Sequence, residues 1–97
     1  MVAMEEFQQR RAPARQRRIS DVSMSDERVR VVGVVIDKRD TELTLDDGTA
    51  RLTVIFDDPA VSAGFEVGSK VRVFGTPLSV AGANELHADI VQSVDKL

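Results

Sequence analysis

"RVRVVGVVIDKRDTELTLDDGTARLTVIF", residues Arg28 to Phe56, alternates polar and apolar side chains with a period of two. This period is typical of β-strands with one buried face, because successive side chains of a strand point to opposite sides. The stretch predicts one strand that ends near Arg39, followed by a hairpin. Asp47-Gly48 supplies the hairpin turn, since glycine readily takes the positive φ that tight hairpin turns require.

The parity of these strands assigns a core side. In the first strand Val29 and Val31 face inward until Gly33 interrupts the apolar run. A glycine inside a strand often marks a bulge or bend, so this strand is expected to curl across two sheets. The predicted inward residues of the hairpin are Leu43, Leu45, Leu52, Val54 and Phe56, and its outward residues include Thr44, Arg51, Thr53 and Ile55.

The rest of the sequence predicts a short helix and two more strands. Asp57 or Asp58 can cap a helix that begins at Pro59. The next strand, 70–80, places Val71 and Val73 inward and Lys70, Arg72 and Phe74 outward. The last strand, 85–94, places Leu86, Ala88 and Ile90 inward and Glu85, His87 and Asp89 outward. Five short strands with a helix between the third and fourth predict an all-β fold, the five-stranded Greek-key barrel called the OB-fold.

Composition limits the chain to a single small domain. Its 97 residues include no cysteine, which excludes disulfides and thiolate metal sites. The sequence has no signal peptide and no apolar run of the roughly 20 residues that span a membrane, so we expect a cytoplasmic protein without a membrane partner. Residues 1–18 are predicted to be a basic, flexible, extended arm and residues 19–97 the OB-fold domain.

Charge is divided unevenly between these two parts. The net charge is -3 and the pI about 5.1, but the arm carries five arginines against two glutamates. The remainder has eight basic and fourteen acidic residues, a net charge of -6. The arm can tether phosphates, solubilise the chain, or lie as a strap along the domain's own acidic surface. Its arginines are Arg10, Arg11, Arg15, Arg17 and Arg18.

Four segments together resemble one protein family across nearly the whole chain: "RRAPARQRRISDV", "RVRVVGVVIDKR", "LTLDDGTARLTVIF" and "VGSKVRVFGTPLSV". They are similar to the small and middle OB subunits of archaeal and eukaryotic replication protein A, and to related subunits of the telomere-capping CST complex. The resemblance implies binding of single-stranded DNA, or RNA, in DNA replication and repair. It also implies other replication protein A-like subunits as partners.

In this family, nucleic acid lies across the second and third strands between two flanking loops. Carried onto this chain, the resemblance implies contacts from Lys38, Arg39, Arg51, Thr53, Ile55, Arg72, Phe74 and His87, with the five arginines of the arm. Bases stack on aromatic rings while arginines follow the phosphates. The chain has four Phe and no Trp or Tyr. Phe74 has outward parity, whereas the parity of Phe56 favours the core.

This shortage of aromatic residues favours a second hypothesis, an assembly subunit with little affinity of its own for nucleic acid. Family members usually assemble through a helix after the fifth strand. The segment "VQSVDKL" is too short for that helix, so either the helix lies outside this sequence or assembly uses another surface.

The sequence contains no catalytic signature. It lacks a nucleophile elbow and a phosphate-cradling glycine loop, and a single histidine is available as a base, so we expect no enzyme activity, no cofactor and no small-molecule substrate. Glu85, His87 and Asp89 share one strand face, but a lone histidine seldom suffices for a metal site, and no metal is predicted.

Overall fold

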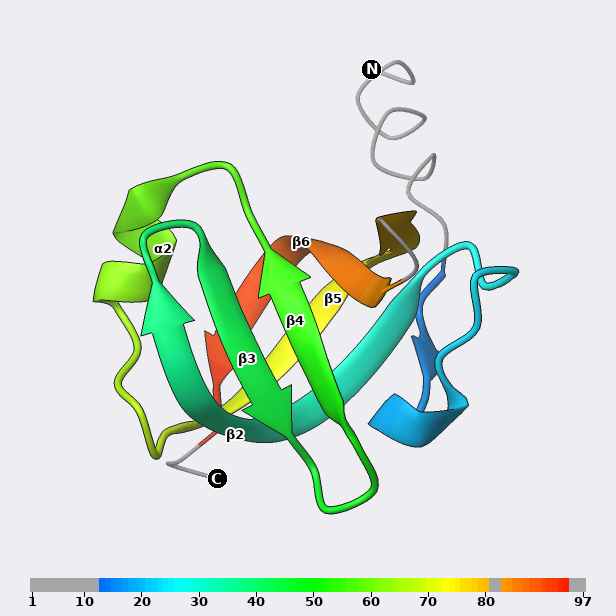
Figure 1. Cartoon of the computed structure of the whole chain (residues 1–97), viewed down its shortest axis with the longest axis horizontal. Helices are drawn as coiled ribbons and strands as arrows, with labels where there is room; N and C mark the ends of the chain where they lie inside the picture. The colour runs from blue at the N-terminus through cyan, green and yellow to red at the C-terminus, as the bar shows by residue number, and fades with distance from the viewer. Residues whose placement is uncertain (1–12, 81–82, 95–97) are drawn as a thin grey trace, which may run out of the picture.

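The structure, a computed structural model, describes residues 13–80 and 83–94, which form a closed β-barrel (Figure 1). Its elements are β1 (Arg15–Gln16), the 3₁₀ turn η1 (Ile19–Asp21), β2 (Val29–Arg39), β3 (Glu42–Asp46), β4 (Arg51–Ile55), α2 (Pro59–Ala63), β5 (Lys70–Val80) and β6 (Ala83–Ser93). The strand order is β1-β2-β3-β4-β6-β5, and β5 pairs with β2 to close the barrel. β4 and β6 run parallel, while the other barrel pairs are antiparallel. The predicted OB-fold is confirmed.

The core is made by the inward side chains of all five barrel strands together with Ile19 of η1. The five hairpin residues predicted to face inward are buried, Phe56 among them, and so are the inward valines of β2 and β5. Phe56 is 4% exposed, which assigns it to the core rather than to a stacking surface. No helix of the described residues is long and apolar enough to cross a membrane.

β2 belongs to both halves of the barrel. Val34 is opposite Lys70 of β5 and also opposite Asp46 of β3, so the strand changes partners one residue after Gly33. A Cβ at Gly33 would lie 3.2 Å from the carbonyl oxygen of Asp46, closer than most real Cβ contacts. The prediction that the strand curls across two sheets at this glycine is confirmed.

The predicted turn and helix start are also present. Gly48 has φ 89° in the β3–β4 turn. At α2, the Asp58 carboxylate accepts a hydrogen bond from the Ala60 N–H at 2.9 Å, and Pro59 begins the helix. The helix start follows from local chemistry, because the Asp carboxylate accepts a free N–H there and Pro has no N–H that needs an acceptor.

β6 contains a bulge that sequence parity did not predict. Phe74 is opposite Ile90 and Gly75 is opposite Ala88, so Asp89 is an extra residue on β6. One extra residue reverses the alternation of a strand. Ile90 therefore shares the outer side with Phe74, while Val91 packs against the core in its place. The prediction that Ile90 faces inward is wrong for this reason.

Residues 13–18, the described part of the predicted arm, lie on the barrel. β1 runs parallel to β2, with hydrogen bonds of 3.0 Å from the Arg15 N–H to the Arg28 carbonyl and from the Arg17 N–H to the Arg30 carbonyl. Here the structure differs from the expectation of a free arm, because β3 pairs only with the second half of β2 and leaves this edge open. Arg10 and Arg11 lie outside the described residues.

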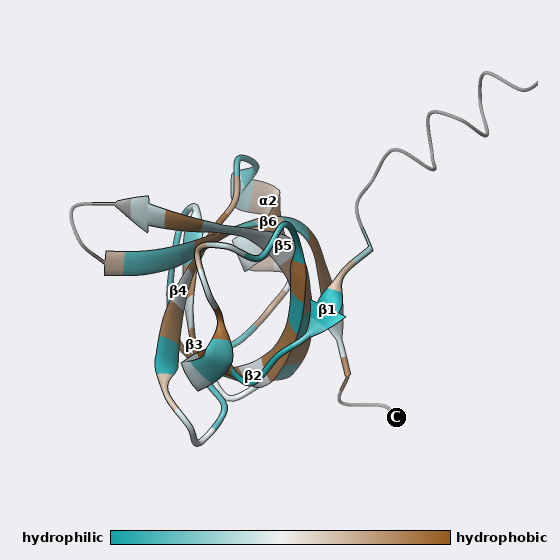
Figure 2. Ribbon diagram, turned by 90° about the vertical axis from the view of Figure 1, so that its right-hand side faces the viewer, coloured by the Kyte–Doolittle hydropathy of each residue, from teal (hydrophilic) through white to brown (hydrophobic). Residues whose placement is uncertain are grey.

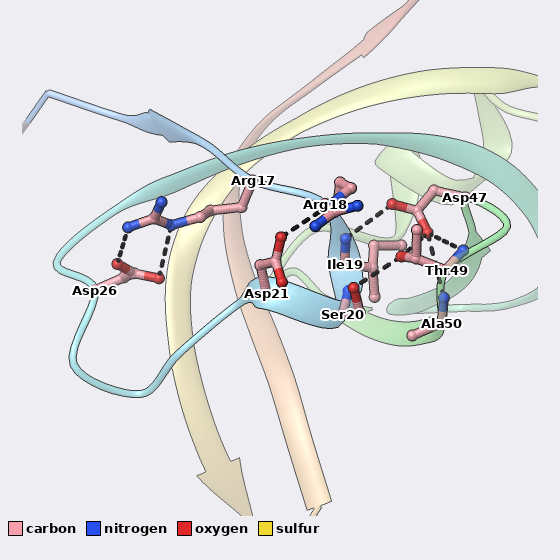
Figure 3. Close-up of polar contacts among 9 residues, drawn as sticks. All are labelled: Arg17, Arg18, Ile19, Ser20, Asp21, Asp26, Asp47, Thr49 and Ala50. Atoms are coloured by element: carbon pink, nitrogen blue, oxygen red, sulfur yellow. Dashed lines mark hydrogen bonds and ion pairs between the residues drawn. The ribbon is translucent and has the colours of Figure 1, made fainter.

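Two carboxylates hold the strap, residues 15–26: Asp47 of the β3–β4 turn ties it to the barrel, and Asp26 closes the strap on itself (Figure 3). Asp47 accepts the Ile19 N–H at 2.8 Å, and Asp26 accepts Arg17 at 3.2 Å. Partial burial of Asp47 opposes its ionisation, but the N–H groups of Ile19, Thr49 and Ala50 and the Thr49 hydroxyl hold its pKa below the usual value. The Arg17 guanidinium and then the Ser23 N–H lower the pKa of Asp26.

Gly75→Ala is expected to destabilise the barrel strongly. A Cβ there would lie 2.5 Å from the His87 carbonyl oxygen and 2.9 Å from the Ala88 Cα, both backbone atoms that cannot swing away. The free energy of unfolding should fall by about 3 kcal/mol, the upper part of the overpacking range. Urea denaturation measures it. Gly64→Ala is the control, since its Cβ meets only one atom, at 3.5 Å. Similar stability of the two variants would contradict the contact at Gly75.

Asp47→Ala is expected to lower the free energy of unfolding by about 1–2 kcal/mol at pH 7, because three N–H groups lose their acceptor. A lowered folded-state pKa stabilises the protein above the ordinary pKa of about 4, and this contribution is lost as the pH falls through the folded value. The difference from wild type should therefore shrink below about pH 4. Denaturation curves from pH 7 down to acid test this, with exposed Asp40→Ala as control. A difference independent of pH would disprove the role of the charge.

Candidate nucleic-acid interface

The predicted contact residues divide between two faces of the barrel. The β3–β4 face is made by the outward residues of β3, β4 and the adjoining part of β6: Glu42, Thr44, Asp46, Arg51, Thr53, Ile55, Glu85 and His87. The β2–β5 face is made by the outward residues of the other sheet: Gln16, Arg30, Val32, Arg72, Phe74, Ile90 and Gln92. Figure 2 shows β3 and β4 on the left of the barrel and β1, which adjoins β2, on the right.

The β3–β4 face corresponds to the surface that binds oligonucleotides in many OB-folds. Its cross-strand rows are Glu42–Ile55–His87, Thr44–Thr53–Glu85 and Asp46–Arg51. Three carboxylates stand against one arginine, and Arg51 is paired with Asp46 at 3.2 Å. The face contains no Phe, Tyr or Trp, and the imidazole of His87 is its one ring among the described residues. Its charge and composition oppose the binding of phosphates and bases.

His87 also has an acidic neighbour on this side. Its Nε2 lies 3.4 Å from Asp57, whose side chain is 91% exposed. Glu85, on the same strand, is opposite Thr53. No group of three potential metal ligands occurs within residues 13–80 and 83–94.

Lys38 and Arg39 differ in their surroundings. Lys38 Nζ donates to the carbonyl of Ser62, in the last turn of α2, at 3.3 Å and to that of Phe65, just after the helix, at 3.0 Å. Lys38 is in β2, and its ammonium group holds the helix against the barrel. Arg39 is exposed and lies 3.8 Å from Asp37. The structure therefore gives Lys38 a structural role.

The β2–β5 face is basic and carries an aromatic side chain, in contrast to the acidic β3–β4 face. Arg30, Phe74 and Ile90 form one cross-strand row, and Val32, Arg72 and Gln92 form the next. Arg30 donates to the side-chain oxygen of Gln16 at 2.7 Å, and Arg72 donates to that of Gln92 at 3.4 Å. Amide partners leave the positive charge of both arginines uncompensated, which suits them to phosphate.

Phe74 is the centre of this face. The guanidinium carbon of Arg28 lies 5.2 Å and that of Arg30 6.0 Å from the ring centroid, within the range of cation–π attraction. Arg28 is held in place by a two-point pair with Asp89, at 3.1 and 2.9 Å, and is only 9% exposed. The half-buried ring and two guanidinium planes make the Phe74 cluster, defined as Phe74, Arg28 and Arg30.

The described arginines of the arm, Arg15, Arg17 and Arg18, lie within the strap. Arg17 pairs with Asp26, and Arg18 pairs with Asp21 at 2.9 Å. Arg15 is exposed on β1, beside the start of β2. Intramolecular carboxylates thus compensate Arg17 and Arg18, which reduces what they can offer to phosphate.

Sequence reasoning did not include Arg28 and Arg30 among the contact residues. The sequence did contain a pattern that points to them. The outward Arg28 and Arg30 of "RVR" alternate in the same way as the outward Arg72 and Phe74 of "RVF". Only the β2–β5 register places Arg30 opposite Phe74. A pairing of strands distant in sequence was therefore needed to find the cluster.

Known structures share this fold, although no protein-family model and no curated protein sequence matches the chain. The Stn1–Ten1 complex of S. pombe contains a chain that is 25% identical, with a TM-score of 0.63 over 76% of this chain and 64% of that one. A replication protein A heterotrimer bound to single-stranded DNA contains one that is 22% identical, with a TM-score of 0.60 over 71% and 58%.

The same fold occurs in a different setting. Asparaginyl-tRNA synthetase from Pyrococcus horikoshii is 17% identical, with a TM-score of 0.69 over 82% of this chain but 22% of its own length. This chain spans less than two thirds of the Stn1–Ten1 and replication protein A chains that it matches. It is an OB-fold protein related in structure to subunits of the Stn1–Ten1 complex and of replication protein A.

Proposed function

We propose that this chain binds single-stranded DNA as a non-enzymatic OB-fold subunit of a multi-subunit complex, and that the DNA lies on the β2–β5 face. The observation that carries the proposal is the Phe74 cluster, flanked by Arg72, whose charge faces solvent beside Gln92. The likeness to a heterotrimer described as bound to single-stranded DNA supports the ligand class.

The binding mode follows from this chemistry. Bases stack on aromatic rings and on guanidinium planes, and each stacked base contributes about 1–3 kcal/mol. Arg30 and Arg72 stand on neighbouring rows, where they can meet successive phosphates. One ring and a few charges support weak binding with little sequence preference, because the described residues of this face are too few to read base edges.

A second candidate function is that of an assembly subunit. The β3–β4 face favours it, since its three carboxylates, with no Phe, Tyr or Trp among the described residues, leave that surface better suited to protein than to DNA. The two candidates can both hold if DNA and protein use different faces. The two candidate functions are distinguished by measuring whether the isolated chain binds DNA and whether that binding depends on the β2–β5 face.

Arg30→Glu combined with Arg72→Glu is expected to weaken binding of a labelled oligothymidine by about tenfold or more, because two phosphate contacts become repulsive. The slope of log affinity against log salt should fall by about 2. Fluorescence anisotropy at several salt concentrations measures both. Surface substitutions change stability by only about 0.5 kcal/mol, so the variant should stay folded.

Arg51→Glu is the matched control, an arginine on the β3–β4 face changed in the same way. It should bind DNA nearly as wild type does. Loss of binding in this control with none in the double variant would return the site to the β3–β4 face. If wild type shows no salt-dependent binding at all, the assembly function is the better one.

A further inference from the structure

A groove between α2 and β6 adjoins the β3–β4 face, with which it shares His87. Two adjoining hollows of about 280 and 440 Å³ share Phe56, Val61, Ala88 and Asp89. Phe65 and Val91 add further apolar surface to the first hollow. These side chains pack against the core from one side and line the hollow from the other. The floor of the groove is therefore apolar.

The rim of the groove is acidic. Asp57, Asp58 and Asp89 border the second hollow, and no lysine or arginine is among the residues that line either one. Asp57 is almost fully exposed, so its charge faces any incoming group. Asp89 is paired with Arg28, so the uncompensated charge of the rim lies on its Asp57 and Asp58 side, which repels nucleic acid and attracts a cationic side chain.

One edge of β6 borders the same groove. β4 pairs with β6 only from Thr53 to Ile55, opposite Glu85 to His87, and the chain then leaves for α2. In the described residues, no strand pairs with that side of β6 after His87. An open strand edge can accept an extended segment of another chain through backbone hydrogen bonds.

We infer that this groove binds an extended segment of a partner protein in which apolar side chains alternate with arginine or lysine. The apolar residues would fill the floor, the cationic residues would meet the Asp57 side of the rim, and the backbone would run along β6. Alternation suits an extended segment, because its successive side chains point to opposite sides. This site goes beyond the DNA-binding proposal: it shares no residue with the β2–β5 face and is linked to the Phe74 cluster through the Asp89–Arg28 pair, which the variants below leave intact.

The inference is tested with a short fluorescein-labelled peptide in which leucine alternates with arginine, and a matched peptide in which leucine alternates with glutamate. Fluorescence anisotropy should show saturable binding of the first and much weaker binding of the second. Asp57→Lys should weaken the first by about fivefold or more, the effect of about 1 kcal/mol. Asp21→Lys, an exposed carboxylate on η1, is the charge-matched control and should leave binding unchanged.

A second variant tests the apolar floor. Ala60 is exposed on α2 and lines the first hollow, so Ala60→Arg should fill it and abolish peptide binding while the thermal melt stays cooperative. Equal binding of the two peptides, or equal effects of Asp57→Lys and Asp21→Lys, would overturn the inference. Dimerisation of the chain in sedimentation, removed by Ala60→Arg, would assign the groove to a second copy instead and also overturn it. The Arg30→Glu and Arg72→Glu variant should bind the peptide normally, which keeps this test separate from the DNA test.

Discussion

The close approach of Gly75 to the backbone of β6 is the constraint on which the outer surface depends. Without a side chain at this position, β6 can bulge at Asp89. The bulge aims Asp89 at Arg28, which holds that guanidinium over Phe74, and it moves Ile90 to the same side. The absence of a Cβ at Gly75 thus affects where Asp89, Arg28 and Ile90 lie relative to Phe74.

The barrel separates its charges by sheet. Carboxylates predominate on β3 and β4, and arginines with amide partners lie on β2 and β5. A net charge of -3 conceals this division, because opposite patches cancel in a sum. Electrostatic attraction acts over about 10 Å at moderate salt, so each patch steers its own ligand even when the whole molecule is acidic.

Local patterns predicted most of the fold. Strand periodicity placed Leu43, Leu45 and the buried Phe56 correctly, and turn chemistry located Gly48 and the start of α2. What escaped prediction depends on contacts between distant segments. The parity of Ile90 depends on the bulge opposite Gly75, and the two residues of β1 are too few to show a period. For the candidate site, sequence parity placed Phe74 and Arg72 outward but could not supply the guanidinium groups around the ring. Contact of these residues with DNA stays a prediction.

The pairing of β1 with β2 has a consequence for how the protein behaves at high concentration. An uncovered strand edge is a template on which another molecule can add, and proteins protect such edges to avoid aggregation. β1 covers part of the β2 edge with two residues and few hydrogen bonds, so its opening costs far less than global unfolding. β1 is thus a short cover on this edge, and weakening the hydrogen bond between Asp47 and Ile19 is expected to expose the edge while the barrel stays folded.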